Sequence, residues 1–137
     1  MESSESSQQR GRILLVDDEA DLGEALTRVL CGKGGFDVVH ELSSETALRH
    51  LQTGSWDPLI TDIELPGMSG LDLLEHARQV APGLPVAVLT GHPTVDYAVS
   101  ALRNSAAEFL QKPIAPRDLI AKAAAPRTRS EQQAVTP

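Results

Sequence analysis

Aromatic residues are scarce in this chain: they make up 3% of its 137 residues. A folded core must therefore be built from Leu, Val, Ile and Ala. The single cysteine, Cys31, excludes an internal disulfide and a cysteine-based zinc site. No apolar run approaches the roughly 18 residues of a membrane span. The first ten residues are rich in Ser, Gln and Glu, so they are not expected to be a signal peptide.

Basic residues are also fewer than acidic ones. The chain has 12 Lys and Arg residues and 19 Asp and Glu residues, which gives a net charge of −7. A chain of this balance lacks the basic surface that binds nucleic acid or an anionic membrane. We therefore expect a cytoplasmic protein that makes no direct contact with nucleic acid and none with a membrane.

Enough apolar sequence is present for one folded domain. Apolar residues make up 41% of the chain, and 137 residues is about the length of one domain. Both ends of the chain are polar. Residues 1–11 are predicted to form a disordered N-terminal tail, and residues 126–137 a flexible C-terminal tail. We expect the folded domain to span residues 12–125.

Two periodicities alternate five times within that domain. Short apolar runs, typical of buried strands, occur at 13–16, 59–63 and 86–89; a more exposed strand is expected at 36–40 and a short one at 108–110. Helical stripes follow them near 22–30, 47–51, 73–80, 95–106 and 119–123. In the fourth stripe, the residues expected to face inward are Val95, Ala98, Val99, Leu102 and Ala106. The pattern predicts an α/β fold, a doubly wound (βα)5 arrangement around a five-stranded parallel sheet.

Charged and hydroxyl side chains follow four of these strands. They are Asp17, Asp18, Asp62, Glu64, Thr90 and Lys112. The carboxyl ends of parallel strands meet at one edge, where such folds bind ligands. Clustered carboxylates raise one another's pKa unless a cation lies among them, and oxygen ligands suit Mg²⁺. A metal ion together with Lys112 would favour a bound phosphoryl group, and Thr90 could donate to one of its oxygens.

The chain resembles the receiver domain of two-component response regulators. The resemblance rests on ILLVDDE, ITDIELPGMSGLDLL, VLTGH and EFLQKP, in that order. The intervals also fit: 45 residues from Asp17 to Asp62, 28 more to Thr90 and 22 more to Lys112. The segment TGHPTVDYAVSALRNSAAEFLQKP is most similar to the receivers of nitrogen-regulation and nitrogen-fixation regulators. The resemblance implies the flavodoxin-like strand order 2-1-3-4-5.

The resemblance also implies a metal-dependent phosphoacceptor. Asp62 would take a phosphoryl group from a sensor histidine kinase or a phosphotransfer protein. Asp18, Asp62 and the backbone carbonyl of Glu64 would bind Mg²⁺ directly, with Mn²⁺ as a substitute. Asp17 would act through water.

A switch is implied beside the phosphoacceptor. Thr90 and Lys112 would contact the phosphoryl group, and Phe109 would turn inward when Thr90 moves. The bond from Lys112 to Pro113 is expected to be cis. The output would pass through the face formed by the helix at 95–106, the strand at 108–110 and the last helix. A second copy of the chain or an effector would bind that face.

The residues by themselves leave two other functions to consider. A Mg²⁺-dependent aspartyl-phosphate phosphatase uses the same ion and residue types, but Asp62-Ile63-Glu64 lacks its second Asp. A flavodoxin-like cofactor carrier needs a phosphate loop, and the acidic residues after the first strand would repel a phosphate. The leading hypothesis predicts no enzyme beyond self-catalysed phosphorylation and dephosphorylation.

A few other positions carry expectations. Glu64 and His92 either face each other across the site, where they would affect loss of phosphate, or both point to solvent. His40 and His50 are expected at exposed positions. Ser105 stands where the resembled family usually has Gly.

Overall fold

The computed structural model describes residues 11–124, so the predicted tails, residues 1–11 and 126–137, lie outside this range except for Gly11. Nine helices and strands are bounded within it: β1 (Arg12–Val16), α2 (Ala20–Gly32), β2 (Asp37–Glu41), α3 (Ser44–Thr53), β3 (Leu59–Asp62), α4 (Gly70–Val80), β4 (Val86–Thr90), α5 (Val95–Arg103) and β5 (Glu108–Gln111). Residues 116–124 form the last helix. None of these described helices is long and apolar enough to cross a membrane.

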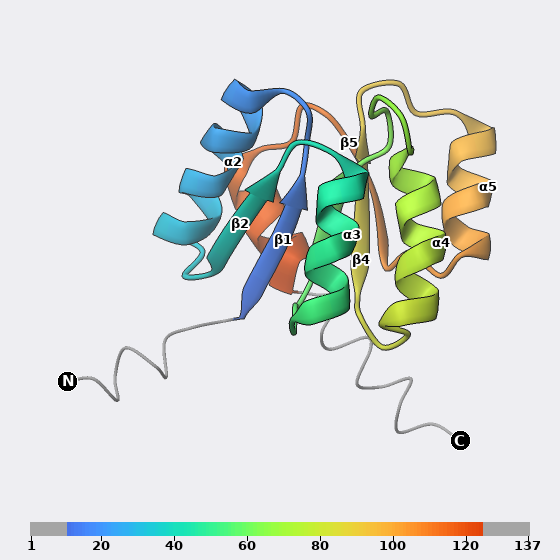
Figure 1. The fold of residues 1–137 in the computed structure, drawn as a ribbon. Helices are drawn as coiled ribbons and strands as arrows, with labels where there is room; N and C mark the ends of the chain where they lie inside the picture. Colours follow the sequence, from blue (N-terminus) through green and yellow to red (C-terminus); the bar gives the residue numbers. More distant parts are fainter. Residues whose placement is uncertain (1–10, 125–137) are drawn as a thin grey trace, which may run out of the picture.

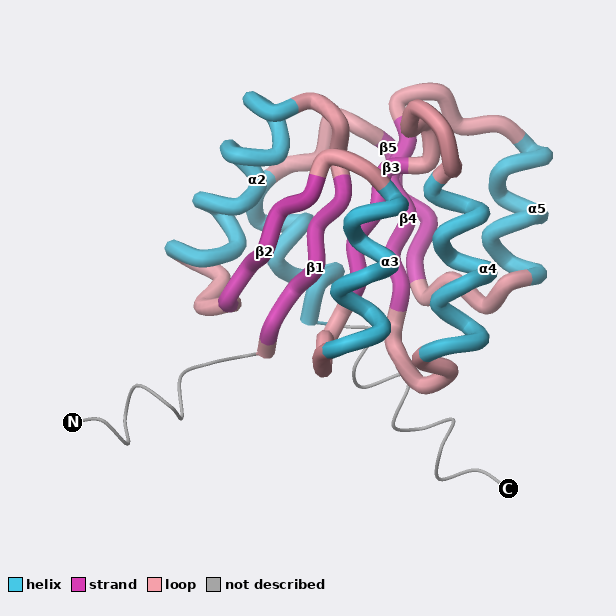
Figure 2. The backbone as a smooth tube through the Cα atoms, in the orientation of Figure 1, coloured by secondary structure: helices cyan, strands magenta, loops and turns pink. Residues whose placement is uncertain are grey.

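The five strands form one parallel sheet in the order β2-β1-β3-β4-β5 (Figures 1 and 2). The register places Leu15 beside Ile60, Ile60 beside Ala87, and Val88 beside Phe109. This order confirms the predicted flavodoxin-like topology. It also brings the carboxyl ends of β1, β3, β4 and β5 side by side, which is where the predicted site residues lie.

Helices cover both faces of this sheet, and each face has its own core (Figure 1). Successive strand residues point to opposite faces, so Leu14 and Val16 join one core while Ile13 and Leu15 join the other. Helices α3, α4 and α5 pack on the first core, and α2 and the last helix pack on the second. The three central strands, β1, β3 and β4, are mostly apolar because both of their faces are buried, whereas the edge strands β2 and β5 are more polar and less buried.

Helix starts follow the local sequence. The Ser43 side chain accepts from the Thr46 backbone N–H at the start of α3, and Thr94 does the same for Tyr97 at α5. At α4, Ser69 and Asp72 form a reciprocal capping box. These side-chain caps define where α3, α4 and α5 begin.

Gly70 is needed where α4 meets the end of β3. A Cβ atom at this position would lie 1.9 Å from the backbone oxygen of Asp62. The Gly70 N–H also donates to the oxygen of Ile63 at 2.9 Å. Only glycine permits this approach, so the helix begins against the backbone that carries Asp62.

The predicted orientation of α5 is wrong. Val95 and Leu102 are 78% and 77% exposed, and Val99 is exposed as well. The buried side of the helix is instead centred on Ala101, with Tyr97 packed against the same core. The apolar residues are spaced as a helical stripe, but α5 packs on the core through Ala101 and Tyr97, and Val95, Val99 and Leu102 point outward.

Ser105 follows α5 in the left-handed backbone region, with φ of 62°. This conformation costs a residue with a Cβ atom about 1–2 kcal/mol, while glycine adopts it freely. We predict that Ser105→Gly raises the free energy of unfolding by about 1 kcal/mol, since glycine's greater unfolded-state entropy offsets part of the relief. Urea unfolding measures the effect. Ser105→Ala keeps the Cβ atom and should give no gain; equal stability of Ser105→Gly and wild type would contradict the prediction.

Candidate functional site

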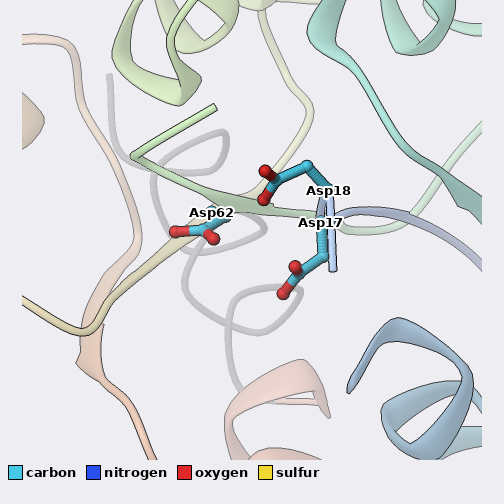
Figure 3. A group of neighbouring side chains, drawn as sticks. All are labelled: Asp17, Asp18 and Asp62. Atoms are coloured by element: carbon cyan, nitrogen blue, oxygen red, sulfur yellow. The ribbon is translucent and has the colours of Figure 1, made fainter. Parts of the chain in front are cut away.

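Three aspartates meet at the carboxyl edge of the sheet (Figure 3). Asp17 and Asp18 follow β1, and Asp62 ends β3. One carboxylate oxygen from each lies within 4.8 Å of the other two. Asp17 is fully buried, Asp62 is 5% exposed, and Asp18 is open to solvent. The structure thus brings together the three carboxylates that the sequence placed at one edge.

Backbone bonds hold these carboxylates in place. The Asp17 N–H donates to the oxygen of Glu41 on β2 at 3.0 Å, and the Asp17 Oδ1 accepts from the Glu19 N–H at 2.9 Å. The Asp62 Oδ1 accepts from the Glu64 N–H at 3.3 Å. Each carboxylate therefore folds back over the turn that follows its own strand.

Lys112 places an ammonium between two of the aspartates. Its Nζ donates to Asp62 Oδ2 at 2.9 Å and lies 3.1 Å from Asp17 Oδ2. Glu19 Oε1, which the sequence did not single out, lies 3.7 Å from the same nitrogen. The Lys112 N–H donates to the oxygen of Thr90 at 2.8 Å, which aligns the ends of β4 and β5. The bond from Lys112 to Pro113 is cis, as expected.

Burial and charge shift two pKa values in the site. Burial raises the pKa of Asp62, and the charge of Asp17 adds to this; the hydrogen bond and charge of Lys112 act in the opposite direction without cancelling it. Burial lowers the pKa of Lys112, but its hydrogen bonds and charge interactions with Asp62 and Asp17 outweigh burial and leave it raised. At neutral pH the ammonium is therefore fully charged.

The side chains fit a divalent cation. When ionised, the three aspartates carry three negative charges and Lys112 one positive charge, so two negative charges remain. Asp17 Oδ2 is buried, and the partner that the described residues offer it is the Lys112 ammonium at 3.1 Å, which Asp62 shares. Clustered, under-compensated carboxylate oxygens are ligands that Mg²⁺ prefers.

Thr90, Glu64 and His92 form a second group at this edge. Thr90 is buried, and its hydroxyl accepts from the His92 N–H at 3.0 Å. Glu64 Oε1 lies 3.1 Å from His92 Nδ1 and 3.5 Å from the Thr90 hydroxyl. Of the two arrangements left open by the sequence, the structure has Glu64 and His92 facing each other. Their effect on phosphate loss stays a prediction.

Two histidines expected at exposed positions are half-buried. His40 Nε2 lies 2.9 Å from the backbone oxygen of Asp17, and His50 Nε2 lies 2.6 Å from Glu41 Oε2. Sequence reasoning missed the first contact. A usable signal was Gly23, a glycine inside the helical stripe predicted near 22–30. Phe109 is half-buried on β5 and packs on the core beneath α5.

Comparison with known proteins identifies relatives of this chain. The response regulator receiver domain family matches residues 13–124. The DNA-binding transcriptional regulator NtrC of Escherichia coli (strain K12) is 40% identical over 105 residues, which cover 77% of this chain and 22% of NtrC. The chain thus spans about a fifth of the length of this relative. Its similarity to NtrC agrees with the predicted nitrogen-regulation subgroup.

Solved structures share the fold. A CheY-like response regulator receiver domain protein from Methanospirillum hungatei JF-1 superposes with a TM-score of 0.84 and 29% identity, covering 89% of this chain and 97% of that one. The beryllofluoride-activated NtrC4 receiver domain dimer gives a TM-score of 0.81 and 25% identity, covering 87% of this chain and 98% of that one.

The raised pKa of Asp62 predicts a stability effect. Ionisation of Asp62 costs the folded state little below the ordinary pKa of 3.8; the cost grows as the pH rises from that value towards the raised pKa and is complete above the raised pKa. We therefore expect Asp62→Asn to raise the free energy of unfolding of the metal-free protein at pH 7 by about 1 kcal/mol. In the Asp62→Asn variant the Lys112 ammonium still has the Asp17 carboxylate as an ion-pair partner, so the substitution does not leave it unpaired.

Urea unfolding in a chelating buffer, at pH 7 and below pH 4, measures this effect. The gain should shrink at the lower pH. Asp37→Asn, which changes an exposed aspartate on β2, is the matched control and should change stability little. An Asp62→Asn protein that is less stable than wild type at pH 7 would contradict the prediction.

Proposed function

This chain belongs to the response regulator receiver domain family, and we propose that it is a phosphoacceptor switch in which Asp62 takes a phosphoryl group from a sensor histidine kinase or a phosphotransfer protein. The observation that carries this proposal is the setting of Asp62. It ends β3 at 5% exposure, 2.9 Å from the Lys112 ammonium and within a cluster of carboxylates. The expected cytoplasmic location stays a prediction.

The transfer needs little chemistry from the protein. An oxygen of Asp62 attacks the phosphorus of a phosphohistidine. The P–N bond breaks, its electron pair stays on the imidazole nitrogen, which takes a proton from water, and an acyl phosphate remains on Asp62. Phosphoryl transfer depends mainly on positioning and charge neutralisation, and Lys112 lies close enough to Asp62 to supply part of both.

Mg²⁺, with Mn²⁺ as a substitute, would be held by Asp18, Asp62 and the Glu64 carbonyl, with Asp17 acting through water. When bound, it would neutralise charge on the phosphoryl oxygens. The other roles fall to side chains. Lys112 would pair with one phosphoryl oxygen, and Thr90 would donate its hydroxyl to another, giving up its contact with Glu64.

The rival phosphatase is not favoured. The family match and the parallel (βα)5 fold both belong to receiver domains, and Asp62-Ile63-Glu64 lacks the second aspartate of such phosphatases. We propose that turnover is limited to self-catalysed phosphorylation and dephosphorylation. Sustained hydrolysis of small phosphate esters would favour the rival instead.

A small phosphodonor tests the proposal directly. Incubation with acetyl phosphate and Mg²⁺ should add one phosphate, detected by intact-protein mass spectrometry. Asp62→Asn and chelation should each remove the addition, because the first removes the attacking oxygen and the second the cation.

Asp37→Asn is the matched control for this experiment. It changes an exposed aspartate outside the site and should accept phosphate as wild type does. Phosphate addition that persists in Asp62→Asn would overturn the assignment of Asp62.

The output face is proposed to bind a second copy of the chain. Val95, Val99 and Leu102 lie at i, i+4 and i+7 on α5, exposed among the described residues. Phe109 packs on the same core as Tyr97 and Ala101 beneath this stripe, so its movement could reach α5. The related NtrC4 receiver domain is described as a dimer in its activated form, which supports a second copy as the occupant.

Sedimentation before and after phosphorylation tests this face. Wild type should dimerise when phosphorylated, and Leu102→Asp should weaken the dimer by about tenfold or more, because it puts a charge in an apolar contact. Leu42→Asp is the matched control: Leu42 is also exposed, at 52%, but lies between β2 and α3. Equal dimerisation of both variants would contradict the proposed face.

A further inference from the structure

His40 holds the peptide that joins Asp17 to Asp18. It lies on β2 opposite Leu15 of β1, and its Nε2 is 2.9 Å from the backbone oxygen of Asp17. A carbonyl oxygen can only accept, so this nitrogen carries the proton. The peptide on the other side of Asp17 is bonded to β2 as well, through the oxygen of Glu41. Both peptide groups that flank the buried aspartate are therefore held by one strand.

Helix α2 is shaped around this ring. Gly23 is buried in the first turns of α2, and a Cβ atom there would lie 2.0 Å from His40 Cε1 and 2.1 Å from Nε2. Glycine inside a helix costs about 1 kcal/mol relative to alanine. Alanine at 23 with a small apolar residue at 40 would also pack the helix on the sheet. What the imidazole adds is an N–H donor directed at Asp17.

We propose that His40 is a positioning residue for the metal site, setting the direction in which the chain leaves Asp17 and hence where the Asp18 carboxylate lies. The inference rests on the proposed function, in which these two aspartates hold Mg²⁺. Asp18 is exposed and follows Asp17 directly, so the peptide plane before it governs its position. Mg²⁺ demands near-ideal ligand geometry, and residues that orient ligands commonly contribute tenfold or more to metal affinity.

The test separates positioning from packing. His40→Ala removes the donor, and the double variant His40→Ala/Gly23→Ala also restores helix propensity in α2, because the alanine Cβ no longer meets a ring. Titration calorimetry with Mg²⁺ on the unphosphorylated protein measures affinity, and urea unfolding measures stability. We expect the Mg²⁺ dissociation constant to rise about tenfold in both variants. Stability should recover in the double variant while affinity does not.

Two further variants complete the comparison. His40→Gln keeps an N–H donor and should recover most of the affinity. His50→Ala removes the other half-buried histidine of this region, which contacts Glu41 and Trp56 rather than the aspartates. It should bind Mg²⁺ as wild type does.

A metal-free measurement keeps this inference distinct from the proposed function. The NMR shifts of the Asp17 carbonyl carbon and the Asp18 amide nitrogen should change in the double variant but not in His50→Ala. A wild type that does not bind Mg²⁺ would overturn the proposed function and the metal role of His40 together. Wild-type Mg²⁺ affinity in the double variant, or unchanged shifts at Asp17 and Asp18, would overturn the role of His40 alone.

Discussion

The charge balance around Lys112 is the constraint on which the site depends. Its ammonium contacts Asp62 at 2.9 Å and Asp17 at 3.1 Å, both buried, while Asp18 lies at the open side. Buried carboxylates are costly unless they are paired, and one ammonium carries a single positive charge against the three aspartates of the cluster. The remaining negative charge suits a divalent cation, and the same ammonium is within reach of a group carried on Asp62. The proposed chemistry thus uses a site that the fold leaves incompletely neutralised.

Two helices contain a glycine that lowers helix stability but allows a close approach to the aspartates of the site. Gly70 lets α4 approach the backbone oxygen of Asp62, and Gly23 lets the His40 ring reach the carbonyl of Asp17. Neither glycine favours a helix, yet each lies where backbone or ring comes too close for a Cβ atom. Stability comes instead from the two apolar cores on either side of the sheet. Asp62 ends β3 and Asp17 follows β1 directly, so the sheet largely sets the separation of these two carboxylates.

Helix α5 also gives up stabilising burial, because it leaves large apolar side chains exposed on the outer surface. Fully burying a Val or Leu side chain typically contributes about 1.5–3 kcal/mol, yet Val95 and Leu102 stay more than three-quarters exposed. The helix is anchored through Ala101 and Tyr97, and Phe109 of β5 packs on the same core. Exposed apolar patches commonly mark association sites. An exposed apolar stripe on a helix with few buried residues fits the association face proposed for this chain.

The sequence by itself determined the parallel (βα)5 fold and the meeting of Asp17, Asp62, Thr90 and Lys112. Short apolar runs that alternate with helical stripes are typical of parallel strands buried on both faces, and the carboxyl ends of parallel strands share one edge. Only the tertiary structure decided which way the α5 stripe points, because periodicity defines the apolar side of a helix but not how it is rotated against its neighbours. It alone also paired Glu64 with His92, and His40 with Gly23. Those contacts join separate elements, and they depend on the side-chain packing between them.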